Sequence, residues 1–425
     1  MRGHILFPIA LTLLPLSGFC QSARTLDDCI KIALENNLEL RKMQVKAAQG
    51  RVDFISTAME ITPSLGADAS AGKSFREEDD PISTVGLNLD ASLSVSLGLS
   101  HYFRSKSAEA AYAASGYEIL SAQKELEVQV TEAFLNVIVA KEALDFAKSN
   151  LETLRGQLSN ARLLFEAGRR SAGALAEICA EELAAEAQLG EAESGLSSCI
   201  LKLSSVMGIQ FDRGMEFEPP KFDYEALPES SESSYTVARR LAKAHPATLA
   251  MARSEKSAKY ALKASVGNLF PTLTIGGSYG SSWNGASDLK WRSQLEDNIS
   301  SGLNLTLSIP LFSSFQARSA IKNGKLAAEA ASISTKITEK EVSERILSLL
   351  VEAEGCRKQL FPAQKSCRAY EELALENEKK FAAGSITATE YSAVLAKYRL
   401  AYFELLQKKW QYYLILKTME IYSDE

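Results

Sequence analysis

The stretch GLNLDASLSVSLGLS, residues 86–100, differs from the chain around it. From Leu87 to Leu99 every odd position is apolar, and every even position is polar or glycine. Side chains of a β-strand point alternately to opposite faces, so this pattern predicts a strand with one apolar and one polar face. Most of the surrounding chain is Ala, Glu, Lys and Leu at helical spacing, so we expect a few strands in a mainly helical protein.

Three further segments alternate in the same way and carry almost no charge. Together the four predicted strands cover roughly residues 64–75, 84–99, 271–283 and 298–312. They are longer than the ~5 to 6 residues usual for strands of soluble domains, and they suit a tilted crossing of an apolar band ~25 Å thick. Four strands are too few to close a barrel, which needs about eight, so several copies must pool their strands. The strand count alone allows two copies or three.

The loops between the predicted strands are polar. REEDDP at 76–81 and NGASDLKWRSQLEDN at 284–298 suit a solvent-exposed position. Trp283 and Trp291 have two open interpretations, an aromatic belt at the membrane interface or packing within the loop.

Length and composition narrow the class of protein. The 425 residues are 46% hydrophobic and 24% charged, and the net charge of −6 argues against nucleic acid as a partner. Residues 1–20 have the basic start, short apolar stretch and small residues of a secretory signal peptide, with cleavage expected near Cys20 to Ser22. The rest of the chain has no apolar segment of the length that a transmembrane helix needs. We therefore predict an exported protein in which any membrane crossing is made by strands.

The sequence carries no pattern typical of an enzyme or a metal site. The three histidines have no nucleophile or carboxylate arranged around them, and no glycine-rich phosphate loop is present. The six cysteines match no metal-ligand spacing. Cys179 and Cys199 share one predicted helix at a separation too long for a disulfide, as do Cys356 and Cys367. We expect buried, small hydrophobic cysteines, no cofactor, no metal and no catalytic residues.

The chain is a duplicated unit. ITPSLGADAS at 61 matches LFPTLTIGGS at 269, FRSKSA at 103 matches FQARSA at 315, and FEAG at 165 matches FAAG at 381. Landmarks in the same order predict a first repeat at 21–207, a connecting segment at 208–234 and a second repeat at 235–425. Each repeat has a helix of about 35 residues, a strand pair, a very long helix, a glycine break and another long helix.

The long helices carry a seven-residue apolar repeat. In the first repeat it runs from Val130 to Phe165, with a companion line from Ala133 to Ala161, and in the second it runs from Ile346 to Phe381. Pro362 should kink the second helix near Phe361. Such a seam alone also fits a periplasmic coiled-coil scaffold without channel activity. A scaffold would fractionate as a soluble protein, whereas a barrel would require detergent.

The order of these features is similar to that of one family. An export signal, the doubled helix–hairpin–helix unit, Pro63 and Pro271 where each first strand begins, and the FEAG and FAAG motifs resemble the TolC-like outer membrane efflux proteins. The resemblance implies a mainly α fold with transmembrane β. In it, three copies form a twelve-stranded barrel, four strands from each, that continues into a long α-helical tunnel through the periplasm.

The resemblance also implies a location, a function and partners. The protein would lie in outer membrane lipid with a periplasmic extension. It would passively conduct substrates of a tripartite efflux or type I secretion system. An inner-membrane transporter of RND or ABC type would supply the energy through a periplasmic adaptor protein.

Site residues carry over from the family motif position by position. The helix turns at Phe165–Gly168 and Phe381–Gly384 would form the periplasmic tip where the adaptor docks, with Arg169 and Arg170 facing the adaptor or a neighbouring helix. Glu390, six residues after Gly384, matches an acidic residue that lines the closed aperture. The position nine after Gly384 is Ala393, and the first-repeat equivalent of Glu390, six after Gly168, is Ala174, so only part of an acidic ring is kept. A plain solvated glutamate stays open as the alternative for Glu390. The polar strand positions expected to face the lumen are Asn88, Asp90, Ser92, Asn304 and Thr306.

Overall fold

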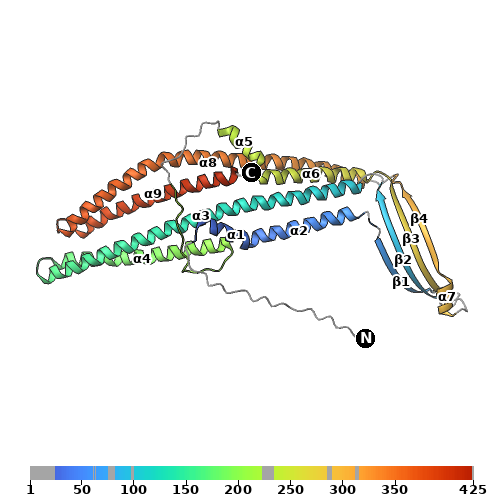
Figure 1. Cartoon of the computed structure of the whole chain (residues 1–425), viewed down its shortest axis with the longest axis horizontal. Coiled ribbons are helices and arrows are strands. Elements are labelled where there is room, and N and C mark those ends of the chain that lie inside the picture. The colour runs from blue at the N-terminus through green and yellow to red at the C-terminus, as the bar shows by residue number, and fades with distance from the viewer. Residues whose placement is uncertain are drawn as a thin grey trace. The chain divides into compact units, whose positions relative to one another are not determined.

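Apart from the short helix α7 (Trp291–Asp297), the same order of helices and strands occurs twice in the computed structural model (Figure 1). The structure describes residues 24–60, 62, 64–74, 82–96, 100–222, 234–284, 290–311 and 315–423. The predicted signal peptide and Pro63 lie outside the described residues. The first set of elements is α1 Leu26–Asn36, α2 Leu38–Met59, β1 Ser64–Ser74, β2 Ile82–Ser96, α3 Ser100–Glu166 and α4 Ala172–Met207. The second set is α5 Ser234–Ala244, α6 Pro246–Gly267, β3 Thr272–Asn284, α7 Trp291–Asp297, β4 Ser300–Ser308, α8 Gln316–Ala382 and α9 Ala388–Ser423.

Corresponding helices of the two sets have equal lengths. α1 and α5 have 11 residues each, α2 and α6 have 22, α3 and α8 have 67, and α4 and α9 have 36. The duplicated helix–hairpin–long-helix plan is therefore confirmed, whereas the repeat limits at 21–207 and 235–425 stay a prediction.

One expectation about the short helices is wrong. Each helix predicted at about 35 residues is divided into two. In the first repeat the division falls at Asn37, which caps the N-terminus of α2. Its side chain accepts a hydrogen bond from the Leu40 amide at 3.0 Å. His245 does the same before α6 and is followed by Pro246, which fits the first turn of a helix because its missing amide hydrogen would be unpaired there.

The described chain divides into two compact units, and neither coincides with a repeat. The unit that we call the turn unit comprises residues 1–36, 126–227 and 356–414. The sheet unit comprises residues 37–125, 228–355 and 415–425. Each unit therefore draws segments from both repeats.

Many of the heptad positions of the long helices are buried. Val130, Val137 and Leu151 are at most 3% exposed, and Ile346 and Leu360 are 3% and 4% exposed. The predicted seam thus supplies much of the core, as expected for apolar residues at coiled-coil spacing. The helix continues through Pro362 in α8 without a break.

The cysteines behave as buried apolar side chains. Cys29, Cys356 and Cys367 are buried, Cys179 and Cys199 are half-buried, and all five described cysteines are free thiols. Burial raises the pKa of Cys29 to about 12, so this thiol stays protonated and unreactive.

The described part of the connecting segment is attached to the turn unit. The backbone amide of Arg24 donates to the Glu216 carbonyl at 2.9 Å, and the Glu218 amide donates back to the Arg24 carbonyl at 3.1 Å. Phe217, between them, is 3% exposed and meets the Phe134 ring edge-on at 5.8 Å. Residues 223–233 of this segment lie outside the described residues.

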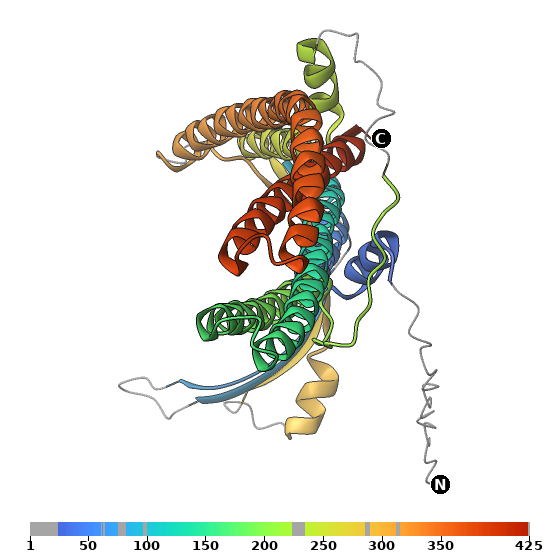
Figure 2. The same ribbon diagram turned by 90° about the vertical axis from the view of Figure 1, so that its left-hand side faces the viewer.

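The four strands form one antiparallel sheet in the order β1-β2-β3-β4, seen as a curved layer in Figure 2. The strands were predicted to within a few residues, except that β4 has 9 residues and is shorter than expected. Positions 75, 97–99 and 312 of the predicted strands lie outside the described residues.

The strand register places the apolar residues of the neighbouring strands on one face of the sheet. Leu273 pairs with Leu307 and Ile275 pairs with Leu305, while position 93 of β2 pairs with Ile275 on its other side. The face is exposed, since Leu303 and Leu305 are 84% and 68% accessible.

A helix that the sequence did not predict lies in the second polar loop. α7 packs beside β3, and its Gln294 is only 3% exposed. The prediction of a loop here was wrong. Packing against β3 stabilises this short helix, and its own sequence carries no sign of that packing.

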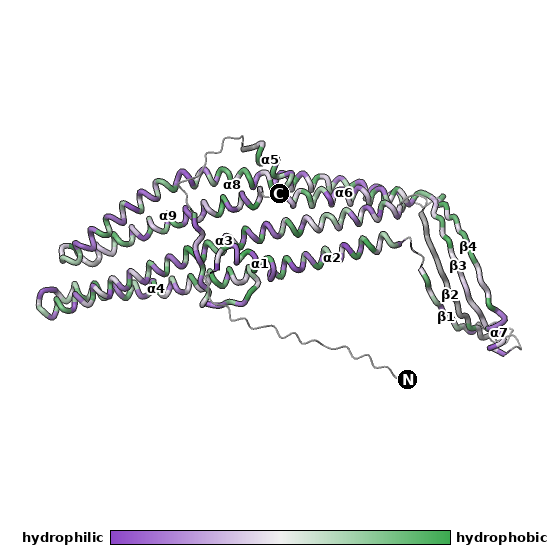
Figure 3. The backbone as a smooth tube through the Cα atoms, viewed as in Figure 1, coloured by the Kyte–Doolittle hydropathy of each residue, from purple (hydrophilic) through white to green (hydrophobic). Residues whose placement is uncertain are grey.

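Apolar residues are distributed along all of the helices (Figure 3). Within the described ranges, no helix combines the length and the hydropathy required to cross a membrane.

Candidate functional site

The two helix turns predicted to form the tip have the same backbone structure. Gly168 and Gly384 have φ angles of +71° and +74°, in the left-handed region that glycine occupies without steric cost. In each turn the amide after the glycine, from Arg169 or Ser385, donates to the carbonyl five residues earlier at 2.8 Å. This arrangement is a Schellman cap, which pairs carbonyls left open at a helix end. The FEAG and FAAG motifs therefore end α3 and α8 in the same way.

The helices that follow the turns are capped differently. Ser171 caps α4 by accepting from the Ala174 amide at 3.2 Å. At α9 the Thr387 hydroxyl accepts from the Glu390 amide at 3.2 Å, and the Glu390 carboxylate accepts from the Thr387 amide at 2.9 Å. These reciprocal bonds form a capping box. Glu390, the predicted aperture residue, is thus bonded to the first turn of its own helix, and its role at an aperture stays a prediction.

The aromatic residues of the two turns differ in burial. Phe165 is 41% exposed, whereas Phe381 is 3% exposed and stacks on Tyr391 with ring centroids 5.4 Å apart and planes 7° from parallel. The Arg170 guanidinium lies 5.6 Å from the centre of the Phe381 ring. Arg170 therefore joins the first turn to the second through a cation–π contact, and Arg169 is exposed.

A carboxylate that sequence reasoning missed makes a second link between the turns. Glu177 on α4 accepts a hydrogen bond from the Thr389 amide of α9 at 3.0 Å and a second bond from the Thr389 hydroxyl. These bonds, the hydroxyl bond first, lower the pKa of Glu177, and the charge of Arg170 adds to the effect. The position nine after Gly168 is Glu177, so applying the family spacing to the first repeat as well as the second would have found it.

An apolar cluster lies beneath these links. Its buried members come from four helices of the turn unit, α3, α4, α8 and α9, and are Leu158, Ala161, Ile178, Phe381 and Tyr391. Ile178 and Ala161 are at most 1% exposed. The two helical hairpins are therefore held together at the turns by a packed core as well as by polar contacts.

Farther along the hairpins, polar side chains connect neighbouring helices. Arg155 of α3 pairs with Glu182 of α4 at 3.1 Å. The Tyr402 hydroxyl of α9 donates to the Glu142 carboxylate of α3 at 3.0 Å. Burial, and after it this hydrogen bond, raises the pKa of Tyr402. Single polar contacts of this kind contribute only modestly to stability, so the apolar cluster is the main tie.

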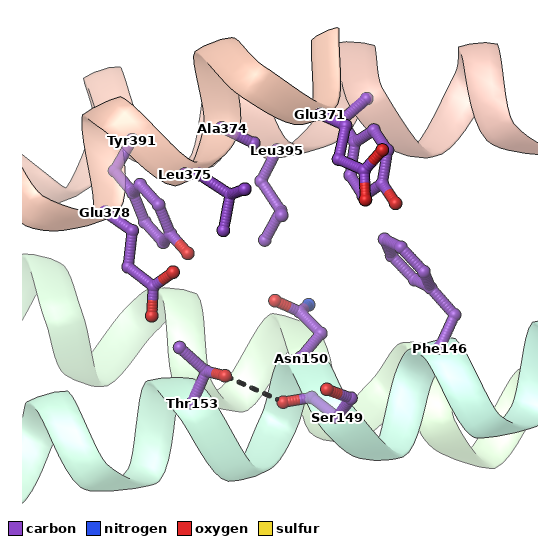
Figure 4. Close-up of a pocket in the computed structure, with 11 residues that line it drawn as sticks. Phe146, Ser149, Asn150, Thr153, Glu371, Ala374, Leu375, Glu378, Tyr391 and Leu395 are labelled. Carbon is purple, nitrogen blue, oxygen red and sulfur yellow. Dashed lines mark hydrogen bonds between the residues drawn. The ribbon is translucent and has the colours of Figure 1, made fainter. Parts of the chain in front are cut away.

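A cavity of about 200 Å³ lies between the hairpins, next to the turns (Figure 4). Glu371 and Glu378 line it from α8, Tyr391 lines it from α9, and Phe146 and Asn150 line it from α3. In Figure 4 the Asn150 side chain points from α3 toward the facing helices, and its carbonyl oxygen is buried without a hydrogen-bond partner within the described chain. The lining residues include no histidine, cysteine or basic side chain.

A metal site is also missing from the part of the chain that the structure describes. No group of three or more His, Cys, Asp or Glu side chains there is arranged to hold an ion.

The strand residues predicted to face a lumen occupy one set of rows in the sheet. Positions 88, 90 and 92 pair with 280, 278 and 276 of β3, and Gly276 pairs in turn with Asn304 of β4. A Cβ atom on Gly276 would overlap the Asn304 side-chain oxygen, so glycine makes room for this amide. Thr306 pairs with Thr274 in the next row of the same face. The register therefore brings the five positions together, and their orientation toward a lumen stays a prediction.

The chain matches the family model described as outer membrane efflux protein over residues 29–208 and 237–418, which is most of its length and both repeats. It belongs to the outer membrane efflux protein family. Its place is accordingly the outer membrane, and it is not an enzyme. The two matched stretches correspond to the two sets of elements, so the duplicated fold and the family agree.

Solved structures agree with this fold. The Campylobacter jejuni CmeC outer membrane channel superposes with a TM-score of 0.79 at 15% identity, over 94% of this chain and 87% of that one. The Neisseria gonorrhoeae MtrE outer membrane channel in its open state superposes with a TM-score of 0.76 at 18% identity, over 93% and 88%. At these identities the likeness supports the fold alone.

One curated relative is similar in sequence. The alkaline protease secretion protein AprF of Pseudomonas aeruginosa is 26% identical over 194 residues, which is 45% of this chain. The match spans 39% of the length of AprF.

Proposed function

We propose that three copies of the chain form a channel that passively conducts substrates across the outer membrane. The strands of the sheet unit would make a twelve-stranded barrel, four from each copy. The long helices would make a tunnel in the periplasm. A periplasmic adaptor and an inner-membrane transporter of RND or ABC type would deliver the substrate and supply the energy.

The observation that carries this proposal is a sheet with two open edges and an exposed apolar face. β1 and β4 are edge strands, and the face that bears Leu303, Leu305 and Leu307 is more than half accessible at each of these residues. In lipid an open edge leaves backbone groups unpaired at a cost of several kcal/mol each, so strands of several copies must close the sheet. If β1 of one copy pairs with β4 of the next, the backbone groups of both edges gain hydrogen-bond partners and the barrel closes.

The turns of the turn unit suit a docking role for the adaptor. Phe165 is 41% exposed and Arg169 is exposed, so the first turn offers an aromatic and a cation. Phe381 is buried. The first turn is therefore the better candidate for the adaptor contact, and the second would hold the hairpins together.

The stoichiometry is tested by the mass of the detergent-solubilised protein. The full sequence has a mass of 46.3 kDa before the predicted signal peptide is removed, and a complex of three mature chains is expected after subtraction of the detergent. A single chain, or two chains, would contradict the proposal. The alternative, a periplasmic coiled-coil scaffold, requires the protein to remain soluble without detergent, which the exposed leucine face argues against.

Two variants separate the possible roles of Glu390. Glu390→Gln keeps a side chain that completes a capping box but removes the charge, whereas Glu390→Ala removes both. If three Glu390 carboxylates ring an aperture, both variants reduce the preference of the channel for cations over anions. If Glu390 only caps α9, the Gln variant conducts as wild type does, and only the Ala variant loosens the turn, by about 1 kcal/mol.

The similarity to AprF supports protein secretion as one candidate for the transported material. Deleting the gene tests this directly. Polypeptides missing from the medium of the deletion strain would support secretion, while increased sensitivity to small toxic compounds with normal secretion would support efflux.

A further inference from the structure

α7 is attached to the apolar face of the sheet. The Ser281 hydroxyl of β3 donates to the Leu295 carbonyl of α7 at 2.5 Å. β3 pairs without a bulge along its whole length, so the odd-numbered Ser281 lies on the same face as Ile275 and Tyr279. Tyr279 is 52% exposed. The helix therefore rests on the face that an outer membrane protein turns toward lipid.

α7 also lies at the end of the sheet away from α6. β3 begins just after α6 and ends at Asn284, and the Asn298 side-chain amide, just past α7, donates to the Ser282 carbonyl near that end at 2.8 Å. With the long helices on the periplasmic side, this end of the barrel reaches the outer leaflet.

Trp291 is exposed although it belongs to the side of α7 that faces the protein. It precedes Gln294 by three residues and Leu295 by four, so the three side chains share one side of the helix. Gln294 is 3% exposed and Leu295 is half-buried, whereas Trp291 is 62% exposed. The sheet thus packs against part of this side and leaves the largest side chain uncovered. Ile299, just beyond the helix, is 51% exposed.

Cations flank this tryptophan. Lys290 and Arg292 are exposed, and neither has an ion-pair partner within the described part of the chain. The acidic residues of the segment, Glu296 and Asp297, lie at the other end of α7. An indole between two cations matches a membrane interface, where tryptophan lies at headgroup level and cations reach phosphates.

We propose that α7 is an interfacial anchor that binds the phosphate-bearing lipids of the outer leaflet. Trp291 lies at the boundary between headgroups and acyl chains, and Lys290 and Arg292 bind lipid phosphates. The inference rests on the outer membrane location and does not depend on conduction or on the transported substrate.

Tryptophan fluorescence in proteoliposomes tests the position of Trp291. The chain has 3 tryptophans, and comparing Trp283→Phe with Trp283→Phe/Trp291→Phe isolates the emission of Trp291 while leaving the buried Trp410 unchanged. We expect lipids brominated near the headgroup to quench about half of the Trp291 emission, and aqueous iodide to quench little of it. Quenching by iodide alone would place Trp291 in water, and protection from both quenchers would place it under protein. Either result overturns the proposal.

A second comparison tests the phosphate contacts. Brominated phosphatidylglycerol should quench Trp291 more than brominated phosphatidylcholine does when each is a minor component of otherwise identical vesicles. Lys290→Gln/Arg292→Gln should abolish this difference, and the control Arg239→Gln/Arg240→Gln, on the exposed surface of α5, should preserve it. Equal quenching by both lipids in the wild type overturns the phosphate assignment. A protein that fails to bind the vesicles at all would instead contradict the proposed function.

Discussion

Phe165 and Phe381 occupy the same position of the two turn motifs, but truncating Phe381 should destabilise its turn much more than truncating Phe165. Phe381 is 3% exposed, stacks on Tyr391 and lies under Arg170, whereas Phe165 is 41% exposed. Replacing a buried phenylalanine with alanine costs about 3–5 kcal/mol, including the cavity left behind. Complete burial of a phenylalanine contributes about 1.5–3 kcal/mol, so the partly exposed Phe165 should cost about 1 kcal/mol.

The expected difference is large enough to measure locally. Phe381→Ala should destabilise its turn by about 3 kcal/mol more than Phe165→Ala does, which is about a hundred-fold larger rise in the opened population. Amide hydrogen exchange of the peptides around each turn reports this population without requiring the whole assembly to unfold. Phe165→Ala should instead weaken adaptor binding. Equal loss of protection in the two variants, or a greater loss around Phe165, would refute the assignment of the second turn as the structural one.

Three further outcomes follow from the contacts. Because the Thr389 hydroxyl is the main cause of the lowered pKa of Glu177, Thr389→Val should return this pKa toward the usual glutamate range, as followed by the pH dependence of exchange at the turn. Burial, with a smaller contribution from a nearby lysine, lowers the pKa of His245 from 6.5 to about 4. The unfolded chain therefore binds a proton between these values that the native state does not, so stability should fall by at most about 3 kcal/mol as the pH drops from 6.5 to 4. His245→Asn, which keeps a cap, should flatten that slope in acid denaturation. Gly384→Ala should destabilise its turn by about 1 kcal/mol because its φ is +74°, while Gly355→Ala, inside α8 with open space around it, should stabilise by about 1 kcal/mol in exchange or thermal measurements.

Features with a local pattern could be predicted from the sequence. The strands and the heptad seam follow from periods of two and seven, so residues such as Leu305 and Val137 were assigned correctly to an exposed apolar face and a buried seam. The glycine turns at Gly168 and Gly384 follow from short motifs. The capping box of Thr387 and Glu390 also has a local pattern, Thr-x-x-Glu after a glycine break, which is typical of a helix N-terminus.

Features that depend on contacts between distant residues could not be predicted. Glu177 meets Thr389 across 212 residues of sequence, and Arg170 reaches Phe381 only because the two hairpins pack side by side. The unequal burial of Phe165 and Phe381 has the same origin, since the FEAG and FAAG motifs set the form of the turn but not the surroundings in which each turn packs. α7 is ordered by packing against β3, which no periodicity in its 7 residues encodes.

The central claim, that this chain forms a channel in the outer membrane, is tested most directly by the conductance of the purified protein in planar bilayers. We predict discrete current steps of uniform size that appear only when the protein is added. They should depend on the sheet, so that a Leu303→Asp/Leu305→Asp variant, which places charges on the apolar face, fails to insert and gives no steps. Protein that associates with the bilayer as the assembled complex and yet produces no steps would contradict the account.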